Sequence, residues 1–251
     1  MNLNLVIFNK DGQRQNVPLT RRTRRTDTRQ SPVVRLSLVL TVSEIYLSVQ
    51  GESTHVGRPC VFVRLTACDL RCRWCDTPYA FTGGRKMPID DVLTEVDRHE
   101  TKLVEITGGE PLLQKEVYPL MERLLERGYE VLLETGGHIP LDDVPEPVIA
   151  IVDVKCPGSG EAAHMHWPNL EELSPHDEVK FVIAGREDFD YAADVTARHR
   201  LTERAAAVLF SPVHGELDPA RLVQWILEAR LPVRMQIQAH KYIWTPETRG
   251  V

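Results

Sequence analysis

Three cysteines lie close together near the end of the first third of the chain, in the stretch A-C-D-L-R-C-R-W-C-D-T. Cys68, Cys72 and Cys75 form a C-x3-C-x2-C array, and thiolates are soft ligands that favour zinc, copper(I) or iron–sulfur clusters. A structural zinc site and a saturated [4Fe–4S] cluster each take four ligands. Three local cysteines would leave one iron of such a cluster open to a small molecule.

Two other readings of the array stay open from the spacing alone. One is a zinc site completed by a distant residue such as Cys60, Cys156 or a histidine, and the other is a chance grouping. The chain has only five cysteines, three of them in the array. This usage indicates a metal site in a reducing compartment and not a disulfide framework. Buried apolar packing is the expectation for Cys60 and Cys156.

Composition narrows the class of protein. The 251 residues carry a net charge of −6, which gives no indication of nucleic-acid binding. No stretch approaches the roughly 18 consecutive apolar residues that a membrane span needs. The first ten residues, M-N-L-N-L-V-I-F-N-K, lack the basic start and long apolar run of a secretory signal. We therefore expect a soluble cytoplasmic protein without a membrane partner.

The beginning of the chain differs in charge from the rest. Residues 1–41 have a net charge of +6, including R-R-T-R-R at 21–25, whereas residues 42–251 have −12. Such a run repels itself, so we expect 1–41 to be a disordered, dispensable extension of a domain at 42–251. A basic arm for nucleic acid or a targeting peptide is the alternative, although no aromatic residues interleave the charges. The apolar run 36–42 could still form a short strand.

The rest of the chain alternates between strand-like and helix-like segments. Strands are expected at 42–48, 60–66, 103–107, 130–134, 148–154, 178–184, 206–211 and 233–237, and helices at 88–99, 117–127, 188–200 and 219–229. This alternation favours parallel βα units, arranged as an open sheet or a barrel. Conspicuous polar and glycine-rich motifs follow several strand ends, and the loops at those ends meet on one face of a barrel.

Several motifs together resemble one enzyme family. The stretch C-x3-C-x-W-C-D-T at 68–77, T-G-G-E-P at 107–111, S-V-Q-G-E at 48–52 and H-K-Y-I-W at 240–244 are similar to those of the 7-carboxy-7-deazaguanine synthases. These are radical S-adenosylmethionine (SAM) enzymes of queuosine and other 7-deazapurine pathways. The resemblance covers about residues 42–251 and implies an α/β fold, a partial TIM-like βα barrel of the radical SAM type.

The resemblance also implies a set of site residues. The metal ligands would be Cys68, Cys72 and Cys75 for a [4Fe–4S] cluster and Thr77 for Mg²⁺. Residues in contact with SAM would be Trp74, Cys75, Asp76, Gly108, Gly109, Glu110, Thr135, Asp153, Val154 and Lys155. The substrate would contact Val49, Gln50, Gly51, Arg64 and Thr107.

Residue chemistry supports some of these roles and leaves others open. Gly108 and Gly109 would let backbone groups approach the methionine part of SAM, and Glu110 would fix the turn. Gln50 offers both a donor and an acceptor to a pterin edge, and Arg64 could pair with a carboxylate in a fork. A strand-end salt bridge is the ordinary alternative for Asp153 and Lys155. A satisfied surface charge is the alternative for Arg64.

The reaction implied is a ring contraction. The reduced cluster would pass one electron to SAM, and the resulting radical would remove hydrogen from 6-carboxy-5,6,7,8-tetrahydropterin. Ammonia would leave, 7-carboxy-7-deazaguanine would form, and SAM would be regenerated. A low-potential electron donor such as flavodoxin or ferredoxin and a homodimeric state are also implied.

Two further hypotheses stay open. A glycyl-radical-activating enzyme shares the cysteine spacing but acts on a protein, and a non-catalytic zinc or electron-transfer protein would not need G-G-E-P. The segment 158–174, which contains His164 and His166, is expected to form a lid or a partner surface and not a metal site.

Overall fold

The computed structural model describes residues 4–8, 14–18, 38–246 and 248–251. The chain divides into two units, Met1–Leu36 and Ser37–Val251. In the first unit, β1 (Asn4–Phe8) and β2 (Arg14–Pro18) pair as antiparallel strands. The disorder expected for 1–41 thus falls largely outside the described residues, and the described part of the first unit forms a two-stranded ladder.

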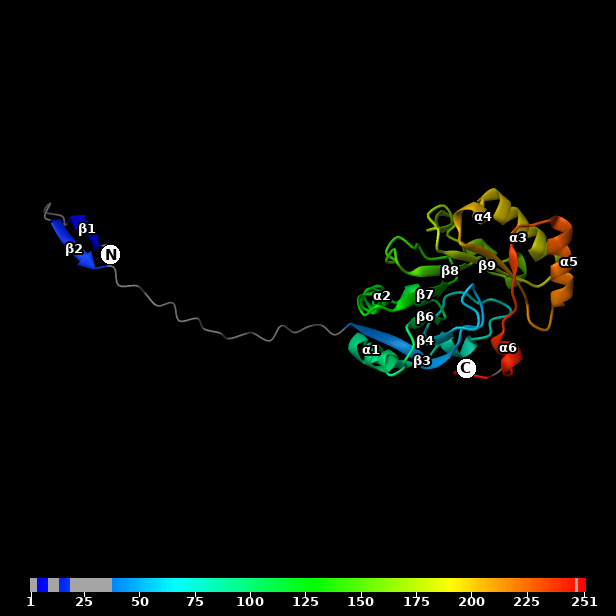
Figure 1. The fold of residues 1–251 in the computed structure, drawn as a ribbon, viewed down its shortest axis with the longest axis horizontal. Helices are drawn as coiled ribbons and strands as arrows, with labels where there is room; N and C mark the ends of the chain where they lie inside the picture. Colours follow the sequence, from blue (N-terminus) through cyan, green and yellow to red (C-terminus); the bar gives the residue numbers. More distant parts are fainter. Residues whose placement is uncertain (1–3, 9–13, 19–37, 247) are drawn as a thin grey trace. The chain divides into compact units, whose positions relative to one another are not determined.

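The second unit is built on a nine-stranded sheet with the order β11-β10-β9-β8-β7-β6-β4-β3-β5 (Figure 1). The strands are β3 (Val39–Val49), β4 (Pro59–Leu65), β5 (Arg85–Pro88), β6 (Leu103–Gly108), β7 (Glu130–Thr135), β8 (Ile149–Asp153), β9 (Glu178–Ile183), β10 (Ala207–Pro212) and β11 (Arg234–Met235). From β4 to β11 neighbouring strands are parallel, whereas β3 pairs antiparallel with β4 and β5. The outer strands β11 and β5 do not pair, so the sheet is a partial barrel, as the sequence predicted.

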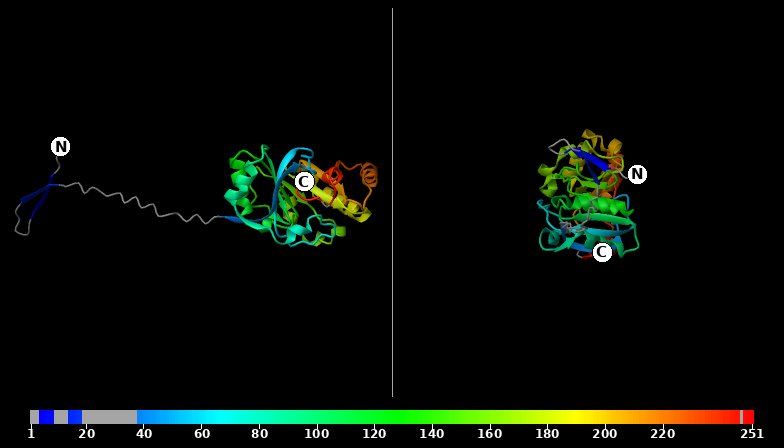
Figure 2. Two further views of the ribbon diagram at one scale, coloured as in Figure 1. Left: turned by 90° about the horizontal axis from the view of Figure 1, so that it is seen from below. Right: turned by 90° about the vertical axis from the view of Figure 1, so that its left-hand side faces the viewer.

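Helices follow most of the parallel strands. They are α1 (Ile89–Asp97), α2 (Val117–Glu126), α3 (Arg186–Arg198), α4 (Leu201–Arg204), α5 (Pro219–Ala229) and α6 (His240–Ile243). The cap expected for α5 is present, because Asp218 Oδ1 accepts from the Ala220 N–H at 3.0 Å. In Figure 1, α1 and α2 lie toward one end of the sheet and α5 toward the other, and Figure 2 gives two perpendicular views. Among the described residues no helix combines the length and apolar composition needed to cross a bilayer.

The first strand of the sheet begins earlier than expected. The sequence places a strand at 42–48, but β3 starts at Val39, and Val39 to Val42 pair with β5. Leu40 and Val42 are fully buried in the core that packs against α1 and α2. The proposed boundary between residues 41 and 42 therefore falls inside a buried strand, because apolar alternation begins within the compositionally basic segment.

The two faces of the sheet carry different side chains. Alternate residues point to opposite faces of a strand, so Val61, Val63 and Leu65 of β4 pack outward against helices. The inner face of the strands carries a small apolar layer made by Cys60, Phe62, Leu103, Leu132 and Ile151. Polar residues follow this layer toward the carboxyl ends of the strands. Cys60 and Cys156 are buried, as predicted.

Short 3-10 turns occupy the long connections. They are Pro78–Phe81, Pro111–Leu113, Pro157–Ser159, Ala162–His164 and Trp167–Leu170. The segment 158–174 therefore contains most of three such turns, and Asn169 holds it to the loop after β7 by donating to the carbonyl oxygens of Gly137 and Ile139 at 3.0 and 2.9 Å. A lid or partner role for this segment stays a prediction.

Candidate active site

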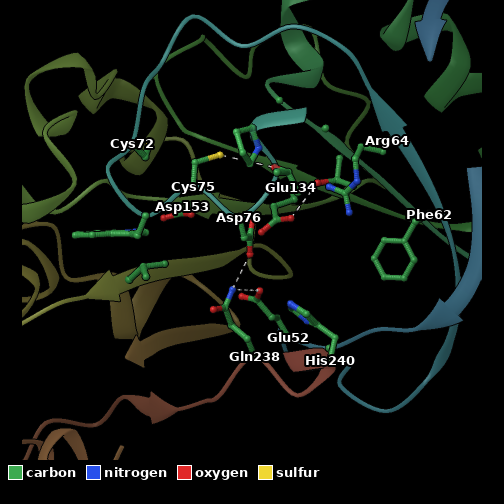
Figure 3. A pocket seen from close by; sticks show the side chains of 18 of the residues that line it. Glu52, Phe62, Arg64, Cys72, Cys75, Asp76, Glu134, Asp153, Gln238 and His240 are labelled. Atoms are coloured by element: carbon green, nitrogen blue, oxygen red, sulfur yellow. Dashed lines mark hydrogen bonds between the residues drawn. The ribbon is translucent and has the colours of Figure 1, made fainter. Parts of the chain in front are cut away.

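A cavity of about 600 Å³ opens at the carboxyl ends of the parallel strands (Figure 3). It is lined by the loops after β3, β4, β6, β7 and β8 and by the C-terminal segment. Every site residue expected from the sequence lines this cavity except Val154. The Val154 side chain is fully buried in the core, because it alternates with Asp153 and so points away from the inner face.

The cysteine loop supplies one end of the cavity. Cys68, Cys72 and Cys75 are free thiols of intermediate exposure. The loop leaves β4 through Ala67, whose φ of 85° lies in the left-handed region, and the Ala67 N–H donates to the Ala80 carbonyl at 2.9 Å. Burial raises the pKa of Cys68 to about 11 and also raises the pKa of Cys72, which favours the neutral form of these two thiols in the absence of a bound cation.

The arrangement of these thiols bears on the zinc alternative. Within the described part of the chain, no three His, Cys, Asp or Glu side chains come close enough together to hold a single metal ion. In the ranges that the structure describes, no distant Cys or His therefore completes a compact zinc site around the array. Three separated thiols that share one cavity suit a larger inorganic cluster, in which each thiolate binds a different iron.

The structure gives a reason for glycine at positions 108 and 109 that the sequence did not suggest. A side chain at Gly108 would collide with the Leu65 carbonyl oxygen, and one at Gly109 would collide with the Ala67 carbonyl and with Cys68. The Gly109 N–H donates to the Leu65 carbonyl at 3.2 Å. Glycine is required here because the end of β6 packs directly against the start of the cysteine loop, whatever else approaches it.

Glu110 fixes the turn after β6, as predicted. Its side chain is 1% exposed and accepts hydrogen bonds from the backbone N–H groups of Leu112 and Gly136 at 3.1 and 2.8 Å. The Thr135 hydroxyl also donates to it, at 2.9 Å. The Thr135 side chain is thus held by the protein itself. His138, from the same loop, lies 2.7 Å from Asp69 and ties the cysteine loop to β7.

Asp153 and Lys155 form a salt bridge, which was the alternative to a SAM-binding role for these two residues. The Lys155 ammonium lies 2.8 Å from Asp153 Oδ2, and both residues line the cavity. Burial lowers the pKa of Lys155, but the charge and hydrogen bond of Asp153 together with the neighbouring Cys72 outweigh burial and raise it. Asp153 Oδ1 is buried without a hydrogen-bond partner within the described chain. An orphaned carboxylate oxygen of this kind fits a ligand hydroxyl, so the ion pair and a binding role are compatible.

Arg64 anchors the opposite end of the cavity. Its side chain is 13% exposed, which excludes the alternative of a surface charge. Arg64 Nε lies 2.8 Å from Glu44 Oε1, and Nη2 donates to the Tyr46 hydroxyl at 2.9 Å. The Tyr79 hydroxyl donates to the same Glu44 oxygen at 2.8 Å. Burial by itself would lower the pKa of Arg64, but these neighbours together raise it above its ordinary value. The guanidinium is therefore held charged and oriented.

Lys180 is a functional residue that the sequence reasoning missed. Its side chain is only 4% exposed, and its ammonium lies 3.1 Å from Glu52 and 3.7 Å from Asp153 and contacts Glu134. Burial raises the pKa of Glu134, but the charge and hydrogen bond of Lys180 together with the Thr107 hydrogen bond outweigh burial and hold that pKa at about 2. A lysine between the apolar residues Val179 and Phe181 of the strand E-V-K-F-V-I was the available signal, because buried lysines are rare unless paired.

Gln50 is less available to a ligand than expected. Its side-chain nitrogen donates to Glu105, its side-chain oxygen accepts from the Glu52 N–H, and the residue is 4% exposed. Each end of the amide therefore already has a protein partner, so only the second N–H and the second lone pair remain. Thr107 is similarly engaged, because its hydroxyl donates to Glu134 at 3.0 Å. Glu105 was not anticipated from the sequence.

The C-terminal segment closes one side of the cavity. Gln238 Nε2 donates to Glu52 Oε1 at 3.0 Å, and the Lys241 ammonium lies 3.0 Å from Asp76. Figure 3 shows Gln238, Glu52 and Asp76 joined in one chain of contacts. Burial opposes the charged form of Asp76, but Lys241 holds its pKa at about 2. The H-K-Y-I-W motif thus reaches back to the residue that follows the last cysteine, and Thr77 Oγ1 lies 3.9 Å from Cys75 Sγ.

Known proteins with related sequences share this architecture. The family model of the Radical SAM superfamily matches residues 63–155. The 7-carboxy-7-deazaguanine synthase of Koribacter versatilis is 52% identical over 224 residues, which cover 84% of this chain and 99% of the relative. That of Chlorobaculum tepidum is 46% identical over 215 residues, which cover 84% and 97%. The chain belongs to the 7-carboxy-7-deazaguanine synthase family.

Solved structures agree with this synthase family on the fold. The crystal structure of QueE from Escherichia coli superimposes with a TM-score of 0.68 at 20% identity, covering 80% of this chain and 95% of that chain. Streptococcus suis SuiB bound to its precursor peptide SuiA matches with a TM-score of 0.53 at 13% identity, covering 68% and 46%. At these identities the matches show the shared fold alone.

Membership in this synthase family brings a [4Fe–4S] cluster and SAM as cofactors. The site of this chain fits both. Three free thiols that line one cavity fit the cluster, and the orphaned Asp153 oxygen beside the charged Lys155 fits a polar organic cofactor. The same cavity is lined by these groups and by Arg64.

Proposed function

We propose that this chain converts 6-carboxy-5,6,7,8-tetrahydropterin to 7-carboxy-7-deazaguanine with release of ammonia, as a carbon–nitrogen lyase of queuosine or another 7-deazapurine pathway. The observation that carries the proposal is one cavity with a three-thiol loop at one end and a buried, oriented arginine at the other. The chain that builds this cavity is 52% identical to a named synthase over nearly the whole of that relative.

The cofactors occupy the end of the cavity where the cysteines lie. Cys68, Cys72 and Cys75 hold the cluster, which when bound supplies the electron that cleaves SAM and so starts the radical chemistry. Trp74, Asp76 and the Gly108–Glu110 turn would contact SAM, together with Thr135, Asp153, the Val154 backbone and Lys155. Asp153 accepts a hydroxyl hydrogen through its orphaned oxygen.

The substrate occupies the end where Arg64 lies. Arg64 binds its carboxylate, because Glu44 and Tyr46 already hold the guanidinium in place and its charge is maintained. The Val49–Gly51 segment and Thr107 contact the heterocycle. Thr77 supplies one oxygen ligand to Mg²⁺, which also takes oxygens from the substrate and water. These residues orient the substrate and exclude solvent, so that the hydrogen to be removed faces the cofactor.

Three properties of the whole protein complete the proposal. A low-potential donor such as flavodoxin or ferredoxin reduces the cluster. The enzyme works in the cytoplasm as a homodimer. Neither nucleic acid nor a membrane is a partner.

Anaerobic assay of the reconstituted protein tests the proposal. With SAM, a low-potential reductant, Mg²⁺ and the pterin, mass spectrometry should detect 7-carboxy-7-deazaguanine without stoichiometric consumption of SAM. The product should disappear when the pterin is omitted. Cleavage of SAM without any ring-contracted product would reject this function and favour an activating enzyme that acts on a protein.

A further inference from the structure

Glu105 occupies an unusual place on the inner face of the sheet. It lies on β6 opposite Phe62 of β4 and Leu132 of β7, two residues before Thr107 on the same face. Its neighbours in this layer are apolar, and Glu105 itself is 2% exposed. A carboxyl group in such a layer is costly to bury, so its presence needs a reason beyond packing.

The side chain of Glu105 is directed at Gln50. The Gln50 side-chain nitrogen donates to Glu105, while the Gln50 side-chain oxygen accepts from the Glu52 backbone N–H. Rotating the amide by half a turn would set its nitrogen against the Glu52 N–H, donor against donor, and would set its oxygen against an ionised Glu105, acceptor against acceptor. The two contacts therefore allow one orientation of the amide.

The charged groups around Glu105 do not explain its position by ion pairing. The pKa of Glu105 is affected through space by the charges of Glu134, Lys180, Glu52 and Arg64. Its side-chain carboxyl accepts a hydrogen bond from the neutral amide of Gln50. Burial, and after it the Glu134 charge, raises the pKa of Glu105 well above its ordinary value. Removing this acid would relieve a desolvation cost, which makes a purely stabilising role a poor account of it.

We propose that Glu105 is a positioning residue that locks the Gln50 amide, so that the site presents its remaining N–H and its remaining lone pair to the substrate in a fixed order. This inference rests on the function proposed above and deepens it. The ligand class is a planar heterocycle whose edge carries both an N–H donor and a carbonyl acceptor. Such an edge is bound well in one orientation and poorly in the reverse, so a locked amide sets how the ring lies relative to Arg64.

Two substitutions of Glu105 separate positioning from structural support. Glu105→Leu matches the apolar layer but removes the acceptor, and Glu105→Gln keeps an acceptor for Gln50. For Glu105→Leu we expect the KM for the pterin to rise at least tenfold, with a smaller change in kcat. Iron content and SAM cleavage without pterin should stay as in wild type, and the melting temperature should stay equal or rise. Glu105→Gln should recover most of the loss in KM. Glu122→Leu, on the exposed face of α2, is the matched control.

A double-mutant cycle decides whether the effect passes through Gln50. In a Gln50→Ala background, Glu105→Leu should add no further rise in KM, because there is no amide left to orient. An unchanged KM in Glu105→Leu, a lowered melting temperature with KM and kcat equally impaired, or a full additional loss in the Gln50→Ala background would each overturn the proposal. If wild type forms no ring-contracted product, the proposed function falls as well. If wild type forms product and Glu105→Leu is normal, this inference falls alone.

Discussion

The two ends of the cavity are held by different kinds of interaction. At the cysteine end the three cysteines are free thiols, and the loop that carries them is held by contacts of other groups, such as the Glu110 N–H donating to the Ala67 carbonyl at 2.7 Å and His138 lying 2.7 Å from Asp69. At the other end the charged side chains are already paired. Arg64 forms an ion pair with Glu44, and Lys180 forms ion pairs with Glu52 and Glu134. The first end leaves soft ligands free for an inorganic group, whereas the second is an electrostatic frame that is complete before any substrate arrives.

The largest effect is expected where the ligands have no substitute. Cys72→Ala should abolish the cluster and all turnover, because each thiolate binds one iron and the described residues offer no compact replacement. Cys68→Ala and Cys75→Ala should do the same. Iron and sulfide analysis with absorbance spectroscopy after anaerobic reconstitution measures this. A full iron and sulfide complement in Cys72→Ala would show that the ligands are assigned wrongly.

The matched controls are the two remaining cysteines. Cys60 and Cys156 are buried in apolar surroundings away from the array. Cys60→Ala and Cys156→Ala should therefore keep the cluster, at a cost in stability of about 1 kcal/mol each from the lost packing.

At the substrate end the loss should be graded and confined to the pterin. Arg64→Ala removes the proposed carboxylate contact and also leaves Glu44 without its ion-pair partner. We expect kcat/KM for the pterin to fall about 30-fold or more, corresponding to the roughly 2 kcal/mol or more that a buried charge pair is worth. Iron content and uncoupled SAM cleavage should change little.

A parallel assay of both reactions on the same preparation is needed for Arg64→Ala. Equal losses of SAM cleavage and pterin turnover would mean that the two ends are not independent. Tyr46→Phe is a milder companion variant, because it removes a single hydrogen bond to Arg64 and keeps the ring stacked on Phe62 at 5.1 Å.

The same contrast explains what could be predicted from the sequence. The cysteine end is local, since Cys68 to Thr77 and Thr107 to Pro111 are two short motifs that follow neighbouring strands, and their meeting was correctly anticipated. The alternation of strands and helices likewise sufficed for the partial barrel. The electrostatic frame was missed because Glu52, Lys180 and Gln238 come from distant segments, and only the folded sheet brings them within hydrogen-bond distance.

Two of the expected contact residues, Gln50 and Val154, lie differently from what the sequence suggested, and each difference has a local structural cause. Gln50 was expected to face the ligand with both polar ends, since nothing in the sequence shows that Glu105 lies across the sheet from it. Val154 was included with its neighbours Asp153 and Lys155, although alternation along the strand turns its side chain into the core. In both cases the direction of a side chain, and not its identity, decides which of its groups a ligand can reach, and the contacts of Gln50 and of the Val154 backbone with ligands stay predictions.

Lys180 tests whether the electrostatic frame also carries stability. Lys180→Met would leave Glu52, Glu134 and Asp153 without the central cation, and we expect a loss of about 3 kcal/mol in the free energy of unfolding at neutral pH. In wild type the pKa of Glu134 lies at about 2, below its ordinary 4.5, so its contribution is present above 4.5 and is lost as the pH falls toward 2.

The pH dependence of Lys180→Met should have the opposite sign. Without the cation, burial raises the pKa of Glu134, so the variant should gain stability as the pH falls from 7 toward 5 and the carboxylate takes up a proton. Urea unfolding of wild type and variant at both pH values measures this. The Glu134 contribution in wild type should not change between pH 7 and pH 5, so a variant whose stability fails to rise relative to wild type over this range would show that Lys180 does not hold the frame together.

The smallest effect is expected from shortening the chain at its beginning. The position of the cut should decide whether the cysteine end of the cavity is affected. Removal of residues 1–36 leaves β3 intact, so melting temperature and turnover should change little.

Removal of residues 1–41 deletes the buried Leu40 and the Thr41 carbonyl that accepts from the Thr66 N–H at 3.0 Å, just before the cysteine loop. It also breaks the link through Gln114, which joins Thr41 to Thr66. The longer truncation should therefore lower the melting temperature and the iron content while the affinity for the pterin is affected less, because Arg64 and Glu44 remain paired. Iron analysis, calorimetry and pterin binding on the two truncated proteins separate these effects. Equal behaviour of the two truncations would mean that the first residues of β3 do not support the cysteine loop, and a large loss from the shorter one would show that the basic segment is part of the working enzyme.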